Sequence, residues 1–273
     1  MSRSIARSLS SVVNGATRWM KPSRRRITRA LIAERLLQEV EVETAAGTLR
    51  FRCSTARSLH DPQRFFENEP ETIRWLDGLP ANDVLWDIGA NIGIYALYAA
   101  RIRGLRVLAF EPSASTYAAL VRNVEMNGLA DRLDTYCLAF DEESRLDHLN
   151  MANTGEGHSM HAFGRSETVQ GAIKVAFRQS VPGFSIDDFC RFYSPPPPDH
   201  IKLDVDSIEE SILKGARETL RRSVRSVLVE VDGTTRERGG VGIRRFLAGL
   251  GFREDEAWAR PDDARNVLFR KFN

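Results

Sequence analysis

The sequence is poor in cysteine. Its 273 residues include only Cys53, Cys137 and Cys190, and none of them belongs to a CxxC pair or to a cluster with histidine. An odd number of widely spaced cysteines does not predict a disulfide framework, and the lack of clustered thiols and imidazoles excludes the usual zinc motifs. We therefore expect a reducing, cytoplasmic setting.

Long apolar runs are also missing. The longest, Ile92–Ala100 and Val224–Val231, fall well short of the roughly 20 residues needed to cross a bilayer. The N-terminal residues are basic, but no apolar segment follows them, so a secretory signal is not expected. The composition, 42% hydrophobic and 28% charged, is that of an ordinary globular protein.

Acidic residues are absent from the first 30 positions, which contain eight basic residues. Within this basic arm, residues 1–39, apolar side chains recur at spacings of three or four at Ile5, Leu9, Val12 and Ala16. The spacing predicts a basic amphipathic helix, a structure that lies on anionic membrane surfaces. The alternatives are a frayed tail or a helix packed on the domain. Nucleic-acid binding is not expected, because the arm lacks a recognition module.

The rest of the chain divides into a cap, residues 40–80, and a larger domain, residues 81–273. The cap is predicted as a hairpin from Val40 to Cys53 and a helix opened by Asp61–Pro62 and running to Leu79. In the larger domain, alternating strands and helices predict an α/β fold with a mainly parallel sheet. The predicted strands are Val84–Ile88, Arg106–Phe110, Leu133–Phe140, His200–Val205, Val224–Val231 and Asn266–Phe272. The predicted helices are Asn91–Arg103, Ser113–Asn127, Ile208–Arg221 and Arg244–Leu250.

One segment, residues 144–180, interrupts this alternation. It is rich in glycine, serine and histidine, with strand-like pieces at Leu146–Met151 and Ala172–Phe177. Because it follows the third predicted strand, it is expected at the carboxyl edge of the sheet, where ligands bind in such folds. We expect this inserted loop to select the substrate.

The most informative motif is Asp87-Ile-Gly89-Ala-Asn91-Ile-Gly93, at the turn from an apolar strand into a helix. Gly89 permits a sharp turn and a close approach to a ligand, and Gly93 permits close packing of the helix on the strand. The helix N-terminus offers unpaired N–H groups to a polar or anionic group. Flavin and nicotinamide proteins use similar turns, so the glycines alone do not identify the cofactor.

Two carboxylates narrow the choice of cofactor. Glu111 ends the next strand, where a carboxylate accepts hydrogen bonds from the two hydroxyls of a ribose. Asp87 ends the strand itself, where it suits a cationic amino group better than a pyrophosphate. The acid at Glu111 is expected for a nicotinamide cofactor as well, whereas Asp87 favours S-adenosylmethionine.

Three segments resemble the FkbM-type methyltransferases and follow one another in the same order as in that family. They are WDIGANIGIYALYAA, VLAFEPSASTYAALVRNVEMNG and IKLDVDSIEESILKGARETL. The resemblance covers roughly residues 83–232. It implies a class I, Rossmann-like fold with a seven-stranded, mainly parallel sheet. It also implies methyl transfer from S-adenosylmethionine to a hydroxyl of a sugar, glycan or natural product, with no nucleic acid as partner.

The resemblance also implies roles for individual residues. Asp87, Gly89, Ala90, Asn91 and Gly93 match the loop that binds the cofactor. Glu111 matches the ribose acid, and Asp141 matches the position that contacts the adenine amino group. Residues 153–159 resemble a glycine- and serine-containing loop near the reaction centre.

The third segment departs from the family. Asp204, Asp206 and Glu209 match a motif that usually reads Asp-Val-Glu-Gly-x-Glu, but Asp206 replaces its first glutamate and Ser207 its glycine. Because Ser207 stands where the family has glycine, the helix start, and with it the acceptor, need not match those of the family.

Two side chains are candidates for orienting or deprotonating an acceptor hydroxyl. Asp204 ends a central strand beside the cofactor loop, and His158 has a pKa suited to proton transfer at neutral pH. Each also has a simpler interpretation: Asp204 as a buried partner that fixes the loop, and His158 as a surface residue.

A metal site is not expected, because acidic strand ends are common in acidic domains. The alternative is Mg²⁺ held by oxygen ligands at two neighbouring strand ends, Asp204, Asp206, Glu230 and Asp232. Two rival functions also stay open: a nicotinamide-dependent (NAD) oxidoreductase on the same fold, and a catalytically inactive binding module.

Overall fold

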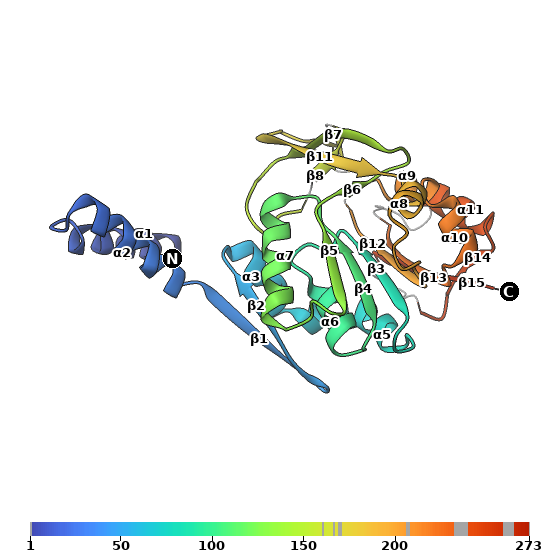
Figure 1. Cartoon of the computed structure of the whole chain (residues 1–273), viewed down its shortest axis with the longest axis horizontal. Coiled ribbons are helices and arrows are strands. Elements are labelled where there is room, and N and C mark those ends of the chain that lie inside the picture. The colour runs from blue at the N-terminus through green and yellow to red at the C-terminus, as the bar shows by residue number, and fades with distance from the viewer. Residues whose placement is uncertain are drawn as a thin grey trace. The chain divides into compact units, whose positions relative to one another are not determined.

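A computed structural model of the chain describes residues 2–159, 161–165, 167–168, 171–205, 208–231, 240–258 and 265–272. Its main feature is a seven-stranded sheet in the order β14-β15-β13-β12-β3-β4-β5 (Figure 1). Neighbours from β13 to β5 are parallel, and the pairs β13–β15 and β15–β14 are antiparallel. The strands are β3 (Val84–Ile88), β4 (Arg106–Phe110), β5 (Leu133–Tyr136), β12 (His200–Leu203), β13 (Ser226–Glu230), β14 (Phe252–Glu254) and β15 (Asn266–Lys271). The predicted α/β, Rossmann-like fold with a seven-stranded, mainly parallel sheet is confirmed.

Helices cover both faces of this sheet. Consecutive residues of β3 point to opposite faces, so Leu85 and Trp86 belong to two separate apolar clusters. One cluster contains α6 and α7, and the other contains α8 to α11. Burial on both faces explains why the central strands are continuous apolar runs. The helices are α6 (Ile94–Arg101), α7 (Ala114–Met126), α8 (Ile186–Tyr193), α9 (Glu209–Lys214), α10 (Arg217–Arg222) and α11 (Val241–Ala248).

The strand order reverses beside β3. From β3 the chain proceeds outward to β4 and β5, and the next strand of this sheet, β12, pairs with the other side of β3. In open α/β sheets, ligands bind at the carboxyl ends of the strands that flank such a reversal. The fold therefore places a binding crevice after Ile88 and Leu203.

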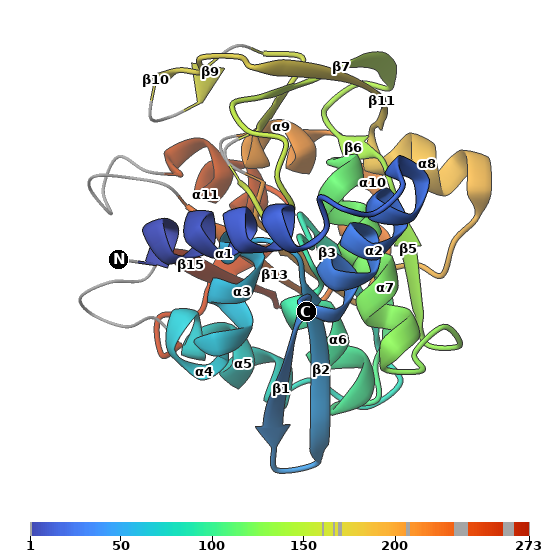
Figure 2. The same cartoon turned by 90° about the vertical axis from the view of Figure 1, so that its left-hand side faces the viewer.

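Residues 139–184 build a second sheet in the order β6-β11-β7-β8, drawn at the top of Figure 2. Its strands are β6 (Ala139–Phe140), β7 (Arg145–Met151), β8 (His161–Phe163) and β11 (Phe177–Phe184), and the short pair β9 (Glu167–Thr168) and β10 (Gly171–Ala172) lies near it. The single strand expected over Leu133–Phe140 is wrong, because β5 and β6 belong to different sheets. The strand expected over Ala172–Phe177 is also wrong, because β11 begins at Phe177 and its residues up to Gly183 pair with β7.

The cap consists of β1 (Gln38–Thr44), β2 (Gly47–Cys53), α3 (Ala56–Gln63), α4 (Phe65–Asn68) and α5 (Pro70–Asp77). The hairpin prediction is confirmed, but the single helix from Asp61 to Leu79 is wrong. The first helix begins earlier because Thr55 and Ser58 form a reciprocal capping box, and Pro62 lies inside it rather than at its start.

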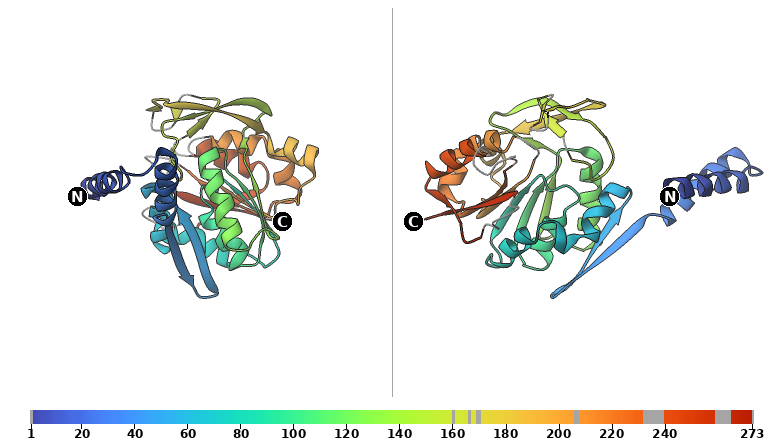
Figure 3. Two further views of the ribbon diagram at one scale, coloured as in Figure 1. Left: turned by 60° about the vertical axis from the view of Figure 1, so that its left-hand side comes forward. Right: turned by 180° about the vertical axis from the view of Figure 1, so that it is seen from behind.

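The cap hairpin is attached to α7 through two asparagine side chains. Asn127 accepts from the backbone N–H of Arg50 and donates to its carbonyl, and Asn123 accepts from the N–H of Arg52. These bonds satisfy the edge of β2, which lies beside α7 in Figure 3.

The predicted helix Ile208–Arg221 is interrupted at Gly215, which separates α9 from α10. A Cβ at this position would lie 2.5 Å from the carbonyl oxygen of Asp141, so a residue with a side chain does not fit. The break brings this turn against the start of the second sheet.

The chain forms two compact units, Met1–Glu39 and Val40–Asn273. The first contains α1 (Ser2–Ala16) and α2 (Pro22–Arg35). In the part of the chain that the structure describes, no helix combines the length and apolar character required to span a bilayer.

A chain of buried polar groups connects the cap to the sheet. The Trp75 indole donates to Ser226 Oγ over 3.2 Å, which lies 2.7 Å from His200 Nδ1, and His200 Nε2 lies 3.1 Å from an Asp83 oxygen. All of these contacts are satisfied by a neutral imidazole that accepts from Ser226 and donates to Asp83. Burial lowers the pKa of His200 despite the Asp83 carboxylate.

This buried histidine predicts a pH dependence of stability. A lowered pKa in the fold means that His200 contributes stability above its unfolded pKa of about 6.5, and that this stability is lost as pH falls below it. His200→Gln should lower the free energy of unfolding at pH 7.5 by about 1–3 kcal/mol through the broken network, and urea titrations should show a smaller difference from wild type at pH 5.5. The matched control is His148→Gln at an exposed site on β7. A difference that is the same or larger at pH 5.5 would contradict this account.

Candidate active site

A cavity of about 540 Å³ opens at the carboxyl ends of β3 and β12. Its lining comes from the cap, from the main sheet and from the second sheet. The residues that line its polar part are Arg57, His60, Asp61, Asn68, Glu69, Glu71, Asp87, Asn91, Glu111, His158, Ser159, His161, Lys202, Asp204, Glu230, Arg265 and Asn266. The cavity therefore brings together side chains that lie as far apart in the sequence as Arg57 and Asn266.

The glycine turn forms the floor of the cavity. Gly89 has φ +84°, and a Cβ there would lie 1.8 Å from the carbonyl oxygen of Asp204 at the end of the neighbouring strand. Gly93, with φ +93°, lies just before α6, where a Cβ would collide with Leu97 and Leu120. Ala90 and Asn91 line the cavity, and Gly89 and Ala90 both donate their N–H groups to the Phe110 carbonyl. Glycine at positions 89 and 93 thus allows β3, β12 and α6 to meet this closely.

Asp87 is buried, and no described side chain hydrogen-bonds to its carboxylate, on which the backbone N–H of Ala96 in the first turn of α6 acts as a donor. Burial raises its pKa to about 6, while the nearby Lys202 ammonium opposes this rise. A buried carboxylate without a side-chain hydrogen-bond donor is costly unless a ligand supplies one. Asp87 therefore fits a cationic group bound in the cavity.

Glu111 is held in a fixed orientation by backbone donors. One of its oxygens accepts from the N–H of Asn91 over 3.0 Å, and the other accepts from the N–H of Ser113 over 2.8 Å. The carboxylate thereby joins the glycine turn to the end of β4. Its position on the cavity wall is compatible with the predicted ribose contact.

Lys202 is a buried cation at the centre of the site. Its Nζ lies 2.9 Å from an Asp204 oxygen and 4.9 Å from the centre of the Tyr95 ring. It is also the register partner of Asp87 across β3 and β12. Burial alone would lower the pKa of Lys202, but Asp204, Glu69 and Asp87 raise it above its usual range, so the ammonium stays charged.

Asp204 and Glu230 share a hydrogen bond at neighbouring strand ends. Burial and the negative charge of Asp204 raise the pKa of Glu230 to about 9. Burial also acts to raise the pKa of Asp204, but Lys202 and the bond from Glu230 outweigh it and hold that pKa below its usual value. At neutral pH the pair therefore carries one proton, on Glu230, and Asp204 is the anion.

The cap supplies another carboxylate to this cluster. An oxygen of Glu69 accepts from the Asn266 side-chain amide over 3.1 Å and from Thr72 Oγ1 over 2.7 Å. Burial raises the pKa of Glu69, and Lys202 acts in the opposite direction. Four carboxyl groups, Glu69, Asp87, Asp204 and Glu230, therefore converge on the same buried ammonium.

His158 lines the same cavity on a loop that is fastened at several points. Glu156 accepts from the N–H and hydroxyl of Ser54, the Thr55 hydroxyl donates to the Glu156 carbonyl, and Gly157 donates its N–H to Thr116. These bonds fix the loop between the cap and α7.

Asp141 lies outside the cavity lining and has partners in the fold. Its oxygens accept from Arg145 Nη2 over 2.7 Å, from Ser211 Oγ over 2.6 Å and from the N–H of Glu142. Burial acts to raise its pKa, but the bonds from Ser211 and Arg145 outweigh this effect and lower it. Its adenine contact stays a prediction, and the observed bonds tie the second sheet to α9.

The alternative magnesium site of Asp204, Asp206, Glu230 and Asp232 stays a prediction, because the structure describes only two of these residues. Asp206 and Asp232 lie outside the described residues, and Asp204 and Glu230 face each other and Lys202. Within the described ranges, no group of three or more acidic, histidine or cysteine side chains is placed to hold a metal ion.

Lys202 and Glu69 are site residues that the sequence pattern did not predict. A lysine two residues before Asp204 in the apolar run Ile201–Leu203 was the available signal, because alternation places both side chains on one face. For Glu69 the sequence offers no comparable signal, since its place depends on how the cap packs against β15.

Comparison with known proteins gives the family. The family model described as Methyltransferase FkbM domain matches residues 87–254, more than half of the chain. Methyltransferase sdnD of Sordaria araneosa is 30% identical over 230 residues, which are 71% of this chain and 83% of that protein. The 31-O-demethyl-FK506 methyltransferase FkbM of Streptomyces tacrolimicus is 28% identical over 186 residues, 67% of this chain and 64% of that protein.

Among solved structures, methyltransferase FkbM from Methylobacillus flagellatus is similar, with 18% identity and a TM-score of 0.44 over 70% of this chain. The chain spans 43% of the length of that solved protein. The family match covers the glycine turn, Glu111, Lys202 and Asp204, which are the residues that meet in the cavity. The chain belongs to the FkbM methyltransferase family.

Proposed function

We propose that the chain transfers the methyl group of S-adenosylmethionine to a hydroxyl oxygen of a polar small-molecule or glycan acceptor. The observation that carries the proposal is the buried Asp87 carboxylate beside the Gly89 turn, to which no described side chain hydrogen-bonds. A cofactor with a cationic amino group and a sulfonium matches a cavity in which carboxyl groups outnumber the nearby ammonium. A pyrophosphate would bring further negative charge to Asp87, which argues against a nicotinamide cofactor.

Each end of this cofactor has a matching group in the cavity. Asp87 would bind the amino group of its methionine part, and Glu111 would accept from its ribose hydroxyls. The N–H groups of Gly89 and Ala90 donate to the Phe110 carbonyl, so these two groups give the turn its shape and are not donors to the cofactor. When bound, the cofactor supplies an electrophilic methyl group on a positively charged sulfur.

The residues of the chain then have to hold the acceptor and take its proton. As the new carbon–oxygen bond forms and the carbon–sulfur bond breaks, the hydroxyl proton must leave the acceptor oxygen. Asp204 is anionic, lines the cavity and lies at the end of β12, so it would accept this proton. His158 lines the same cavity and is the alternative base.

The acceptor side of the cavity is polar. Arg57, His60 and Asn68 come from the cap, and Arg265 and Asn266 come from the start of β15 or just before it. Such a mixture of amide, cationic and acidic groups matches hydroxyl-rich acceptors. The name of the Streptomyces relative places its methyl group on an oxygen, which is consistent with a hydroxyl acceptor here.

The cofactor site can be tested at Asp87. Asp87→Asn should weaken S-adenosylhomocysteine binding by about 10- to 100-fold, because a hydrogen bond to a charged group contributes about 1.5–3 kcal/mol. Isothermal titration calorimetry measures the affinity, and Asp131→Asn, at an exposed site outside the cavity lining, is the control. Tight binding of NAD by the wild type, with none of S-adenosylhomocysteine, would instead support the oxidoreductase.

The proposed base can be tested at Asp204. Asp204→Asn keeps the size of the side chain and should lower kcat by about 10²–10⁴-fold, since a positioned base contributes that much. S-adenosylhomocysteine affinity should change less than threefold or so. His158→Gln is the comparison, and a larger loss of kcat in that variant would transfer the role of base to His158. Cofactor binding without turnover of any hydroxyl acceptor in the wild type would support the inactive module.

The shared proton makes a separate prediction at high pH. If Glu230 is protonated at neutral pH, Glu230→Gln replaces one neutral donor by another, so kcat at pH 7 should stay within a few-fold of wild type. In the wild type, kcat should fall as pH rises through about 9, because loss of the Glu230 proton places two carboxylates in contact. The variant should lack this decline. A tenfold loss at pH 7, or an unchanged decline above pH 9, would show that the pair does not share a proton.

A further inference from the structure

The first compact unit has an exposed apolar stripe. Along α1, the side chains of Ile5, Leu9 and Val12 are 52%, 60% and 65% exposed, and they lie on one face of the helix. Trp19, in the turn that follows, is 81% exposed. Exposed apolar side chains aligned along one helix face indicate a surface that binds something.

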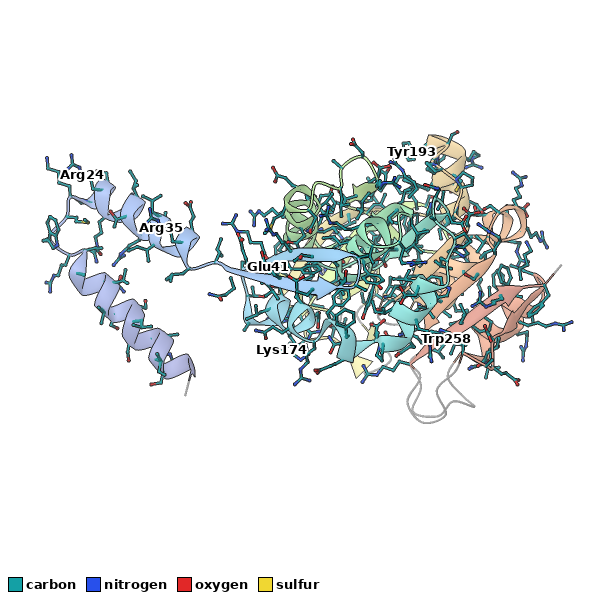
Figure 4. All side chains as sticks on the ribbon, turned by 90° about the horizontal axis from the view of Figure 1, so that it is seen from below. Arg24, Arg35, Glu41, Lys174, Tyr193 and Trp258 are labelled. Atoms are coloured by element: carbon teal, nitrogen blue, oxygen red, sulfur yellow. The ribbon has the colours of Figure 1, made fainter. Side chains whose placement is uncertain are left out.

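The same unit is strongly basic. From residue 2 to residue 33 it has no acidic side chain, and its basic residues are Arg3, Arg7, Arg18, Lys21, Arg24, Arg25, Arg26 and Arg29. Arg7 lies on the face of α1 opposite Ile5 and Leu9, and Arg18 lies in the turn that follows the helix. Figure 4 shows the Arg24 and Arg35 side chains extending from α2.

The two helices hold each other through polar contacts. Arg29 on α2 donates to the Asn14 side chain and to Thr17 Oγ1, and Thr17 is buried at the end of α1. The described residues of α2 include none that is buried, and Ile27 and Leu31 are exposed on it. The apolar side chains of the helical hairpin that α1 and α2 form therefore do not build a core of their own.

We propose that this helical hairpin binds the surface of an anionic lipid bilayer. The stripe of Ile5, Leu9 and Val12 inserts among the acyl chains, and the arginines lie against the headgroups. Apolar insertion and basic attraction together give stable peripheral binding, whereas either one alone is weak. An exposed tryptophan beside them is the side chain that favours the headgroup level.

The positive charge of the first compact unit favours an anionic bilayer as its partner over a second copy of the hairpin and over nucleic acid. A second copy of the hairpin would bring its own cluster of arginines into contact, and like charges disfavour that pairing. Nucleic acid matches the arginines but leaves the apolar stripe in water. An anionic bilayer satisfies both features at once.

Sedimentation of the full chain with vesicles tests the proposal. Vesicles of phosphatidylcholine with about 30% phosphatidylserine have a strongly negative surface potential. Binding to these vesicles should exceed binding to pure phosphatidylcholine by about tenfold or more. The double variant Leu9→Gln with Val12→Gln keeps the charge and should lose about tenfold or more of that binding. The triple variant Arg24→Gln, Arg25→Gln and Arg26→Gln keeps the stripe and should lose the preference for phosphatidylserine.

Control measurements show whether a change in vesicle binding is specific to the substituted residues. Val121→Gln alters an exposed apolar residue on α7 and should leave vesicle binding unchanged. Circular dichroism and S-adenosylhomocysteine affinity of each variant report whether the domain still folds. Three results would overturn the proposal: vesicle binding that survives the double variant, DNA binding that the double variant does not affect, or a wild-type dimer that the double variant dissociates.

Discussion

An excess of buried carboxyl groups over ammonium groups determines the electrostatics of the cavity at the ends of β3 and β12. Glu69, Asp87, Asp204 and Glu230 converge on the Lys202 ammonium, and burying so many acids beside one cation is unfavourable unless protons or a ligand compensate. The pair Asp204–Glu230 keeps a proton, which removes one charge. No described side chain hydrogen-bonds to Asp87, so its carboxylate is the group left for a cationic ligand. The cavity thus favours a positively charged ligand over an anionic one.

The fold brings these groups together through two close approaches of the backbone. At Gly89 the turn after β3 nearly touches the Asp204 carbonyl, so the ends of β3 and β12 meet at the reversal of strand order. At Gly215 the break between α9 and α10 accommodates the carbonyl of Asp141 at the start of the second sheet. The first approach shapes the side of the cavity beside Asp87, and the second fixes the sheet whose Leu149 and Phe163 form part of the cavity wall.

The parts of the site that depend on local sequence could be predicted. The turn at Gly89 and the acid at Glu111 follow directly from apolar strands, so both were placed correctly at strand ends. The strand β11 was missed because Pro182 and Gly183 disfavour a strand, and its pairing with β7 is visible only in three dimensions. Glu69 reaches the site through packing of the cap against Asn266, 197 residues away, and no local pattern encodes such a contact.

The claim that Asp87 receives a cation is tested most directly by the protons exchanged when the cofactor product binds. The pKa of Asp87 is raised to about 6, and an ammonium group placed against it would lower that pKa. Calorimetric titration of S-adenosylhomocysteine in two buffers of different ionisation enthalpy should therefore show release of about half a proton at pH 6 from a half-protonated group. The release should disappear at pH 8 and in the Asp87→Asn variant. Binding without proton release at pH 6, or with proton uptake, would contradict the account.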